Sequence, residues 1–144
     1  MQVFIASKID CLEQQKLNEK IYNFCIKEGF QVHVAQIVLP LNTKATPLQI
    51  LEFNEKAVDD SDIIIVIFDQ IDAGTAMELE RAYIKNKLIL GYRSNNSKKK
   101  EYIGKMLQGA WDRIPNNFKT SSLEELKRMI NNFGMLLNRT TKIL

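Results

Sequence analysis

The sequence predicts an α/β protein with a doubly wound, five-stranded parallel sheet of the flavodoxin or Rossmann type and helices on both faces. Residues 62–68 (DIIIVIF) form a continuous apolar run, which is typical of a central strand buried on both faces. Strand-like and helix-like segments alternate along the chain, as parallel strands with crossover helices require. Polar turn residues follow the strand-like segments, at the edge where ligands bind in open α/β sheets.

Composition predicts one small globular domain over residues 1–144. Hydrophobic residues make up 45% of the chain and charged residues 26%, which are ordinary globular values. The net charge of +3 is too small to predict a nucleic-acid partner, and no apolar run is long enough to span a membrane. We see no signal-peptide pattern and only two cysteines, so we expect a cytoplasmic protein. The cysteines lack a metal-binding spacing and His33 is the only histidine, so we expect neither a metal nor an organic cofactor.

The first strand is expected at residues 2–6, almost at the start of the chain. A helix follows, running to about residue 28. Asp10 is its expected N-cap, with Glu13 completing a capping box and Gly29 ending the helix.

Residues 30–34 alternate in polarity, which predicts a second strand with one wetter face. His33 falls on the polar phase of that strand, so we expect it to be exposed. A loop then leads to Thr46 and Pro47, a favourable start for a helix of about residues 48–60.

The turn after the central strand is acidic and contains Asp69, Asp72 and Gly74, a glycine able to adopt positive φ. Helical spacing begins at Thr75, a suitable N-cap, and Glu78 lies three positions later, as in a capping box. Capping is the ordinary role of a glutamate in this pattern. Three carboxylates at one strand end are nevertheless costly unless the protein uses them.

The second half of the chain repeats the alternation of strand and helix. It is expected to contain a fourth strand at residues 87–92, a polar loop at 93–96, a helix at about 98–110, a short strand within 111–118, and a last helix after the capping signature at Ser121. Residues 140–144 are expected to be a frayed or partner-packed tail.

Residues 72–79 (DAGTAMEL), with Ala82 following, resemble a family signature. The pattern is D-x-G-[TL]-x-x-E-[LI]-G-x-A of the nucleoside 2-deoxyribosyltransferases and related nucleotide N-glycosidases. The resemblance implies that Glu78 is the nucleophile and that Asp72 contacts the base. Glu80 replaces the usual glycine of the signature, and we expect it to crowd the start of the helix.

The same resemblance suggests further site positions. Phe4 stands where several transferases have a tyrosine that positions the nucleophile, and Asn54 stands where many relatives have an aspartate. Gly104 stands where an asparagine or serine reaches the 5′ end of the neighbouring subunit's ligand. A core role for Phe4 and a surface role for Asn54 remain open. The predicted substrate-binding residues are Phe4, Ser7, Asn54, Asp69, Gly74, Thr75, Met77 and Arg93.

The predicted reaction is cleavage of the N-glycosidic bond of a (2-deoxy)nucleoside. A carboxylate below C1′ can stabilise or bond to the oxocarbenium-like sugar, so Glu78 would form a glycosyl-enzyme, and Asp72 would hold the departing base. Transfer of the deoxyribosyl group to another base is the expected outcome. The alternatives are a nucleoside 5′-monophosphate N-glycosidase, which is a hydrolase, and a catalytically weak nucleotide-binding relative.

The expected partners are a nucleoside or nucleotide and a free nucleobase. Family sites are completed by a neighbouring subunit, and the late helix carries an apolar stretch at residues 133–137, so we also expect a homodimer or larger homo-oligomer. A flavodoxin-like regulatory domain binding Mg²⁺ or accepting phosphate is a rival interpretation. It is disfavoured because Ser7 and Lys8, not acidic residues, follow the first strand.

Overall fold

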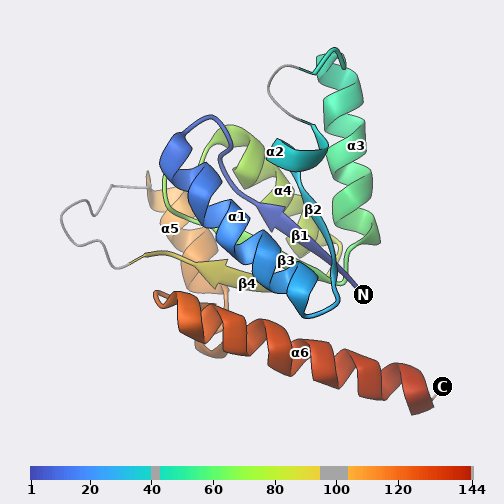
Figure 1. Ribbon diagram of the computed structural model, residues 1–144. Helices are drawn as coiled ribbons and strands as arrows, with labels where there is room; N and C mark the ends of the chain where they lie inside the picture. Colours follow the sequence, from blue (N-terminus) through green and yellow to red (C-terminus); the bar gives the residue numbers. More distant parts are fainter. Residues whose placement is uncertain (40–42, 95–103, 144) are drawn as a thin grey trace.

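The computed structural model describes residues 1–39, 43–94 and 104–143, and its centre is a five-stranded sheet in which every strand pair is parallel (Figure 1). The strand order is β2-β1-β3-β4-β5, the flavodoxin-like order of doubly wound folds. The predicted fold class is therefore confirmed. The strands are β1 (Gln2–Ala6), β2 (Gln31–Val34), β3 (Ile63–Ile67), β4 (Leu88–Tyr92) and β5 (Lys119–Thr120).

Helices cover both faces of the sheet. Helices α1 and α6 pack on one face, and α3, α4 and α5 pack on the other (Figure 1). The helices are α1 (Leu12–Lys27), α2 (Ala35–Val38), α3 (Pro47–Asp60), α4 (Ala73–Ile84), α5 (Gly104–Arg113) and α6 (Leu123–Ile143), with a 3₁₀ turn at Asn116–Phe118.

The central strand β3 is buried along its whole length. Ile63, Ile65 and Ile67 face α1 and α6, whereas Ile64 and Val66 face α3 and α4. Both faces are covered, so neither set of alternating side chains meets water. This double burial explains the apolar run without polar alternation.

Two of the predicted helix starts have different outcomes. Helix α3 begins as expected, because Thr46 and Gln49 cap each other reciprocally and Pro47 occupies the first turn. The capping box expected for α1 is wrong. Its N-cap is Cys11, which makes no side-chain cap bond, while the Asp10 carboxylate lies 3.6 Å from the Lys8 ammonium.

Several boundaries in the second half also differ from the prediction. Helix α5 extends to Arg113, so the fifth strand lies at Lys119–Thr120 rather than within residues 111–118. Helix α6 continues to Ile143, and a frayed tail from residue 140 is therefore wrong. The part of the fourth helix expected at residues 98–103 lies outside the described residues.

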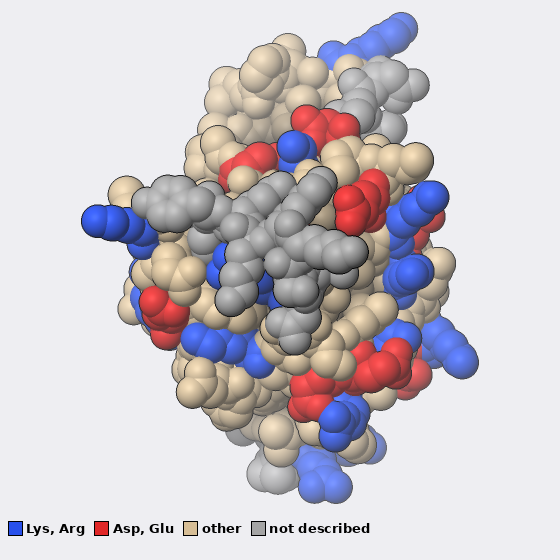
Figure 2. Space-filling model, turned by 90° about the vertical axis from the view of Figure 1, so that its left-hand side faces the viewer, with Lys and Arg blue, Asp and Glu red and all other residues tan. Residues whose placement is uncertain are grey.

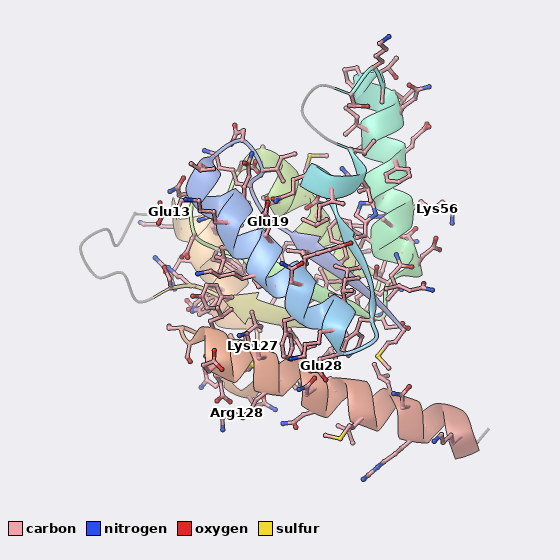
Figure 3. The ribbon with its side chains drawn as sticks, in the orientation of Figure 1. Glu13, Glu19, Glu28, Lys56, Lys127 and Arg128 are labelled. Atoms are coloured by element: carbon pink, nitrogen blue, oxygen red, sulfur yellow. The ribbon has the colours of Figure 1, made fainter. Side chains whose placement is uncertain are left out.

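Charged side chains lie on the outer faces of the helices (Figure 3). The labelled residues lie on α1, α3 and α6 or directly after α1, and they include both signs: Glu13, Glu19, Glu28, Lys56, Lys127 and Arg128. None of the helices in the described part of the chain is both long enough and apolar enough to cross a membrane.

Candidate active site

The predicted site loops meet at one edge of the sheet, because all five strands are parallel. Ser7 follows β1, Asp69 follows β3 and Arg93 follows β4. Strand order reverses direction between β1 and β3, the crevice where open α/β sheets bind ligands. Figure 2 looks onto this edge and shows acidic and basic side chains interspersed rather than one continuous patch of a single sign.

Asp69 joins two of these loops. Its carboxylate oxygens lie 3.0 and 3.3 Å from the Ser94 backbone nitrogen, which donates to them. The Phe68 N–H donates to the Tyr92 carbonyl at 2.8 Å just before this point. Asp69 thus ties the β3–α4 turn to the segment after β4, and its contact with a substrate stays a prediction.

Helix α4 begins earlier than the sequence predicted. Asp72 is the N-cap, and its Oδ1 accepts a hydrogen bond from the Thr75 N–H at 2.8 Å. Aspartate caps well because its negative charge also interacts favourably with the helix dipole. Thr75 is therefore not the cap, and it lies buried in the first turn. Gly74 is also helical, and the positive φ of this turn occurs at Gln70 (φ 50°).

Glu78 lies in the second turn of α4, too far along the helix to cap it. Its side chain is partly buried and makes no hydrogen bond or ion pair with the described residues. Burial, and secondarily the negative charge of Asp72, raise the pKa of Glu78 to about 8. A partly buried carboxyl with a raised pKa at a strand edge is typical of a functional group.

Phe4 and His33 lie against each other below α3. The Phe4 ring is 1% exposed and stacks on the His33 ring with centroids 4.9 Å apart. His33 is only 7% exposed, so its expected exposure is wrong. The reason is that α3 covers this side of the edge strand β2, with Phe53 packing on the imidazole. Phe4 consequently lies within the core.

Asn54 and Met77 occupy different environments. The Asn54 Oδ1 lies 3.1 Å from the His33 Nε2, which connects Asn54 to the aromatic stack. Met77 is largely exposed on the first half of α4. The expected crowding by Glu80 is wrong, because its side chain points outward and forms an ion pair with Arg113 at 3.0 Å.

The basic residues at this edge are partly engaged by their neighbours. Lys8 pairs with Asp10, and the Arg93 Nη1 donates to the Gln108 Oε1 on α5 at 3.2 Å. Ser7 is buried and its hydroxyl donates to the Lys8 carbonyl at 3.3 Å. Gly104 has a φ of 78°, a conformation that favours glycine.

Sequence reasoning missed a buried amide cluster beneath the β1–α1 loop. The Asn18 Nδ2 donates to the Gln36 Oε1 at 2.8 Å and to the Lys8 carbonyl at 3.4 Å. Gln14, one turn earlier on α1, is also buried. The sequence does contain a signal for the two amides on α1. Gln14 and Asn18 continue the buried stripe of Ile21 at helical intervals. Asn18 and Gln36 therefore hold the loop that follows β1.

The described residues contain no group of three or more His, Cys, Asp or Glu side chains arranged to hold a metal ion. What the edge offers chemically is a carboxyl group with a raised pKa at Glu78 and a second carboxylate at Asp72 at the start of the same helix. Such a pair suits nucleophilic and acid–base chemistry on a sugar.

Several solved structures have the same fold as this chain. A CMP N-glycosidase from Clostridium botulinum superposes with a TM-score of 0.61 at 18% identity, covering 91% of this chain and 99% of that one. A conserved protein from Enterococcus faecalis V583 superposes with a TM-score of 0.69 at 18% identity, covering 91% of this chain and 97% of that one. A 2-deoxyribosyltransferase from Bacillus psychrosaccharolyticus superposes with a TM-score of 0.58 at 21% identity, covering 76% of this chain and 82% of that one. These identities establish the fold alone.

The family comparison extends over almost the whole chain. No curated protein sequence matches it significantly. A family model described as nucleoside 2-deoxyribosyltransferase matches residues 3–139, which include Asp72, Glu78 and all five strands except Gln2, the first residue of β1. The resemblance identified in residues 72–79 is thus confirmed at the level of the family. The chain belongs to the nucleoside 2-deoxyribosyltransferase family.

Proposed function

We propose that this protein cleaves the N-glycosidic bond of a (2-deoxy)nucleoside through a covalent intermediate on Glu78 and transfers the deoxyribosyl group to another base. The observation that carries the proposal is the carboxyl group of Glu78, partly buried, unpartnered among the described residues and raised in pKa to about 8. Membership of a family of deoxyribosyltransferases and N-glycosidases supports an enzyme that acts on nucleosides or nucleotides.

In the first step, an oxygen of the Glu78 carboxylate bonds to C1′ while the bond from C1′ to the base nitrogen breaks. The bonding electrons leave with the base, which takes a proton from the carboxyl group of Asp72. In the second step, a nitrogen of another base bonds to C1′ and gives up its proton to the Asp72 carboxylate, while the bond between C1′ and Glu78 breaks and the Glu78 carboxylate is released. Burial disfavours an isolated negative charge on Glu78, so the carboxylate gains most when positive charge develops on the sugar.

The test of the reaction mixes the protein with a deoxynucleoside and a different free base, and separates the products by chromatography. Transfer yields a new deoxynucleoside only when the acceptor base is present. Release of free base without an acceptor indicates hydrolysis. If neither product forms with any purine or pyrimidine deoxynucleoside or its 5′-monophosphate, the proposed function is wrong.

Asp72 has two separable roles, and a pair of substitutions distinguishes them. Asp72→Asn retains an N-cap acceptor for the Thr75 N–H, whereas Asp72→Ala removes it. We expect the alanine variant alone to lose about 1 kcal/mol of unfolding free energy. Both variants should lose about 100-fold in kcat/KM, because neither can assist protonation of the base. Thermal unfolding and steady-state kinetics measure the two effects, and an asparagine variant with parental kcat/KM would contradict the catalytic role.

Hydrolysis of a nucleoside 5′-monophosphate is the second candidate function. Lys8 and Arg93 follow strands at the carboxyl edge, and Lys105 lies at the start of α5. Charge-assisted bonds from such groups to a phosphate are about twice as strong as neutral ones. Gly104, by contrast, offers no side chain to a 5′-hydroxyl, a loss of roughly 0.5–1.5 kcal/mol.

If the substrate is a nucleotide, kcat/KM for a deoxynucleoside 5′-monophosphate should exceed that for the deoxynucleoside. Lys8→Ala, Arg93→Ala and Lys105→Ala should each reduce that preference, by about tenfold for a residue that bonds to the phosphate. Steady-state kinetics on both substrates give the ratio. A preference for the nucleoside that none of the three substitutions alters would exclude the nucleotide candidate and leave deoxyribosyl transfer.

We expect a homodimer or larger closed oligomer. The C-terminal half of α6 extends past the sheet (Figure 1), and Met135 and Leu136 are 56% and 55% exposed there. Phe133 and Leu137 differ, because they pack partly against the core of their own chain. Light scattering should show the oligomer at micromolar concentration. Leu136→Glu should shift it toward monomer, whereas Ile84→Glu, at an exposed apolar residue of α4 on the other face of the sheet, should not. A parental protein that is only monomeric would contradict the expectation.

A further inference from the structure

The amides of Asn18 and Gln36 form a chain of hydrogen bonds whose direction is determined by two backbone carbonyls. The Gln15 carbonyl can only accept, so the Gln36 Nε2 donates to it at 3.1 Å. The Oε1 of the same amide faces the Asn18 Nδ2 at 2.8 Å and accepts from it. The Asn18 Nδ2 also donates to the Lys8 carbonyl at 3.4 Å. Flipping either amide would set its oxygen against a carbonyl oxygen, so this orientation alone satisfies the chain.

The chain ends on the β1–α1 loop, residues 7–11, and holds the backbone of that loop. The Lys8 carbonyl accepts from the chain, and the next carbonyl, that of Ile9, accepts from the Gln15 Nε2 at 2.6 Å. These bonds stand in place of a local cap, since Cys11, the N-cap of α1, makes no side-chain cap bond. The loop is therefore tied both to α1 and, through the chain, to α2.

Asn18 is fully buried, at 0% exposed. Burying an amide is costly unless its hydrogen bonds compensate, whereas a carbonyl in a surface loop can bond to water. The bonds of Asn18 are made through Nδ2, because its Oδ1 has no hydrogen-bond partner among the described residues. The effect of this buried amide is thus directed at Gln36 and the loop.

The β1–α1 loop borders the crevice at the carboxyl edge of the sheet. Ala6, the last residue of β1, pairs with Val66 of β3, so Ser7 follows beside the end of β3. The acidic turn of residues 69–72 leaves β3 at the same edge. Strand order reverses between β1 and β3, and a ligand bound at such a point lies between the segments that follow the two strands.

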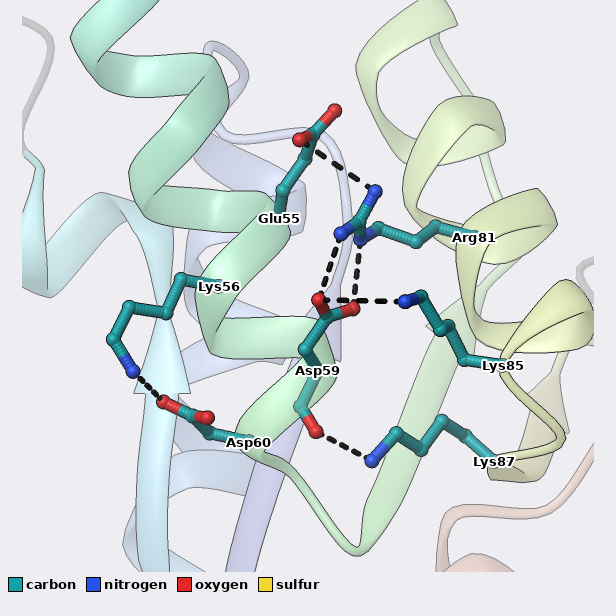
Figure 4. A network of polar contacts seen from close by, with 7 residues as sticks. All are labelled: Glu55, Lys56, Asp59, Asp60, Arg81, Lys85 and Lys87. Carbon is teal, nitrogen blue, oxygen red and sulfur yellow. Dashed lines mark hydrogen bonds and ion pairs between the residues drawn. The ribbon is translucent and has the colours of Figure 1, made fainter.

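The helix that carries Asp72 and Glu78 is anchored independently of this loop. Arg81 of α4 contacts Asp59 at 2.7 Å and Glu55 at 3.5 Å, both on α3 (Figure 4). These ion pairs lie on the face of the sheet opposite to α1. Loosening the β1–α1 loop should therefore leave the two carboxyl groups in place.

We propose that Asn18 and Gln36 are positioning residues that hold the β1–α1 loop in the conformation that binds the substrate. The proposal rests on the proposed function, in which a nucleoside or nucleotide occupies the crevice with its sugar at Glu78. A fixed loop needs no further ordering when the substrate binds, whereas a mobile loop binds only in the fraction of molecules that have the competent conformation. Freeing the loop therefore weakens substrate binding and leaves the bond-breaking step unchanged, because the bound complex is the same.

The first test measures the loop itself and does not depend on activity. Hydrogen–deuterium exchange of the amides in residues 7–11 should be at least about tenfold faster in Asn18→Leu than in the parent. The double variant Asn18→Leu/Gln36→Leu should exchange as fast, but its free energy of unfolding should exceed that of Asn18→Leu, because removing both amides leaves neither partner unpaired. Faster exchange in a variant of restored stability separates the loop from the fold as a whole. Unchanged exchange in both variants overturns the proposal.

Gln14→Leu is the matched control on the same helix. Gln14 lies one turn before Asn18 and is also buried, but its Oε1 has no hydrogen-bond partner among the described residues. Its replacement should leave exchange of the loop at the parental rate. Gln36 is only partly buried, so Gln36→Leu should fold even if the Asn18 variants do not, and it should speed exchange of the loop in the same way.

The second test measures binding in a Glu78→Gln background, where the complex does not turn over. Calorimetry gives the Kd for the four 2′-deoxynucleosides and their 5′-monophosphates. For the probe that binds most tightly, Asn18→Leu and the double variant should raise Kd about tenfold, while Gln14→Leu should stay within about threefold of the parent. In proteins that retain Glu78, kcat should stay within about threefold of the parent, so that KM carries the loss.

Two outcomes of the second test overturn the proposal. A Kd within about threefold of the parent, in a variant whose loop exchanges faster, would show that the loop is held for stability alone. A loss in kcat as large as the loss in kcat/KM would place the effect on the bond-breaking step. If none of the probes binds, the proposed function fails, and the exchange experiment still decides whether Asn18 and Gln36 hold the loop.

Discussion

Glu78→Gln is expected to lower kcat/KM by several orders of magnitude and to leave the fold intact. The substitution keeps the size of the side chain but removes the nucleophilic oxygen, so no glycosyl-enzyme can form. A 2-fluoro sugar nucleoside, which slows release of the intermediate, should add its sugar mass to a peptide containing Glu78 in the parent and not in the variant. Steady-state kinetics and peptide mass spectrometry measure the two effects.

Glu80→Gln is the matched control for this prediction. Glu80 lies on the same helix two residues later, but its carboxylate is exposed and pairs with Arg113 on the surface. Its removal should leave kcat/KM within about threefold of the parent, because exposed ion pairs contribute little. A Glu78→Gln variant that retains more than about a tenth of the parental activity, or sugar attached to another residue, would show that Glu78 is not the nucleophile.

The second large effect is a pH dependence that follows from the raised pKa of Glu78. Burial and the charge of Asp72 bring that pKa from its ordinary value of 4.5 to about 8. The nucleophile must be ionised, so kcat/KM should fall about tenfold for each pH unit below that pKa. The rate of labelling by the 2-fluoro sugar nucleoside should fall in the same way as the pH decreases. A fall in kcat/KM with its midpoint near pH 4.5 would contradict the environment of Glu78 described above.

The raised pKa of Glu78 also makes the stability of the protein depend on pH. Between pH 4.5 and about 8 the native state holds a proton on Glu78 that the unfolded chain has released. The unfolding free energy therefore falls as pH rises through this interval, by ~1.36 kcal/mol for each unit of pKa difference. Glu78→Gln should remove this contribution and be more stable than the parent above the interval. Denaturant unfolding at several pH values, with Glu80→Gln as control, measures the difference.

The sequence predicted the first four strands well because their signals are local, whereas it misplaced β5. The apolar run of β3 and the turns that follow the strands require only neighbouring residues to be recognised. The start of α3 was predicted for the same reason, since Thr46, Pro47 and Gln49 interact within one turn. The start of α4 was misplaced because Asp72 and Thr75 are both good caps, and only the path of the turn decided between them.

The buried polar residues escaped prediction because burial depends on which helix covers a strand. His33 has the alternation of an exposed residue, yet α3 packs over it. Asn18 and Gln36 are distant in sequence and meet only when α1 and the end of β2 are brought together. Alternation within one strand carries no information about such neighbours.

What the sequence by itself determined is the parallel α/β architecture and the family, because these are expressed in periodicity and in one contiguous motif that contains Asp72 and Glu78. Only the tertiary structure decided the state of those residues. The pKa of Glu78 depends on how much water the packed helices exclude and on the position of the Asp72 charge. The hydrogen bond of Asn54 likewise depends on a histidine 21 positions away. Both are consequences of packing between elements, which folding creates and local sequence does not encode.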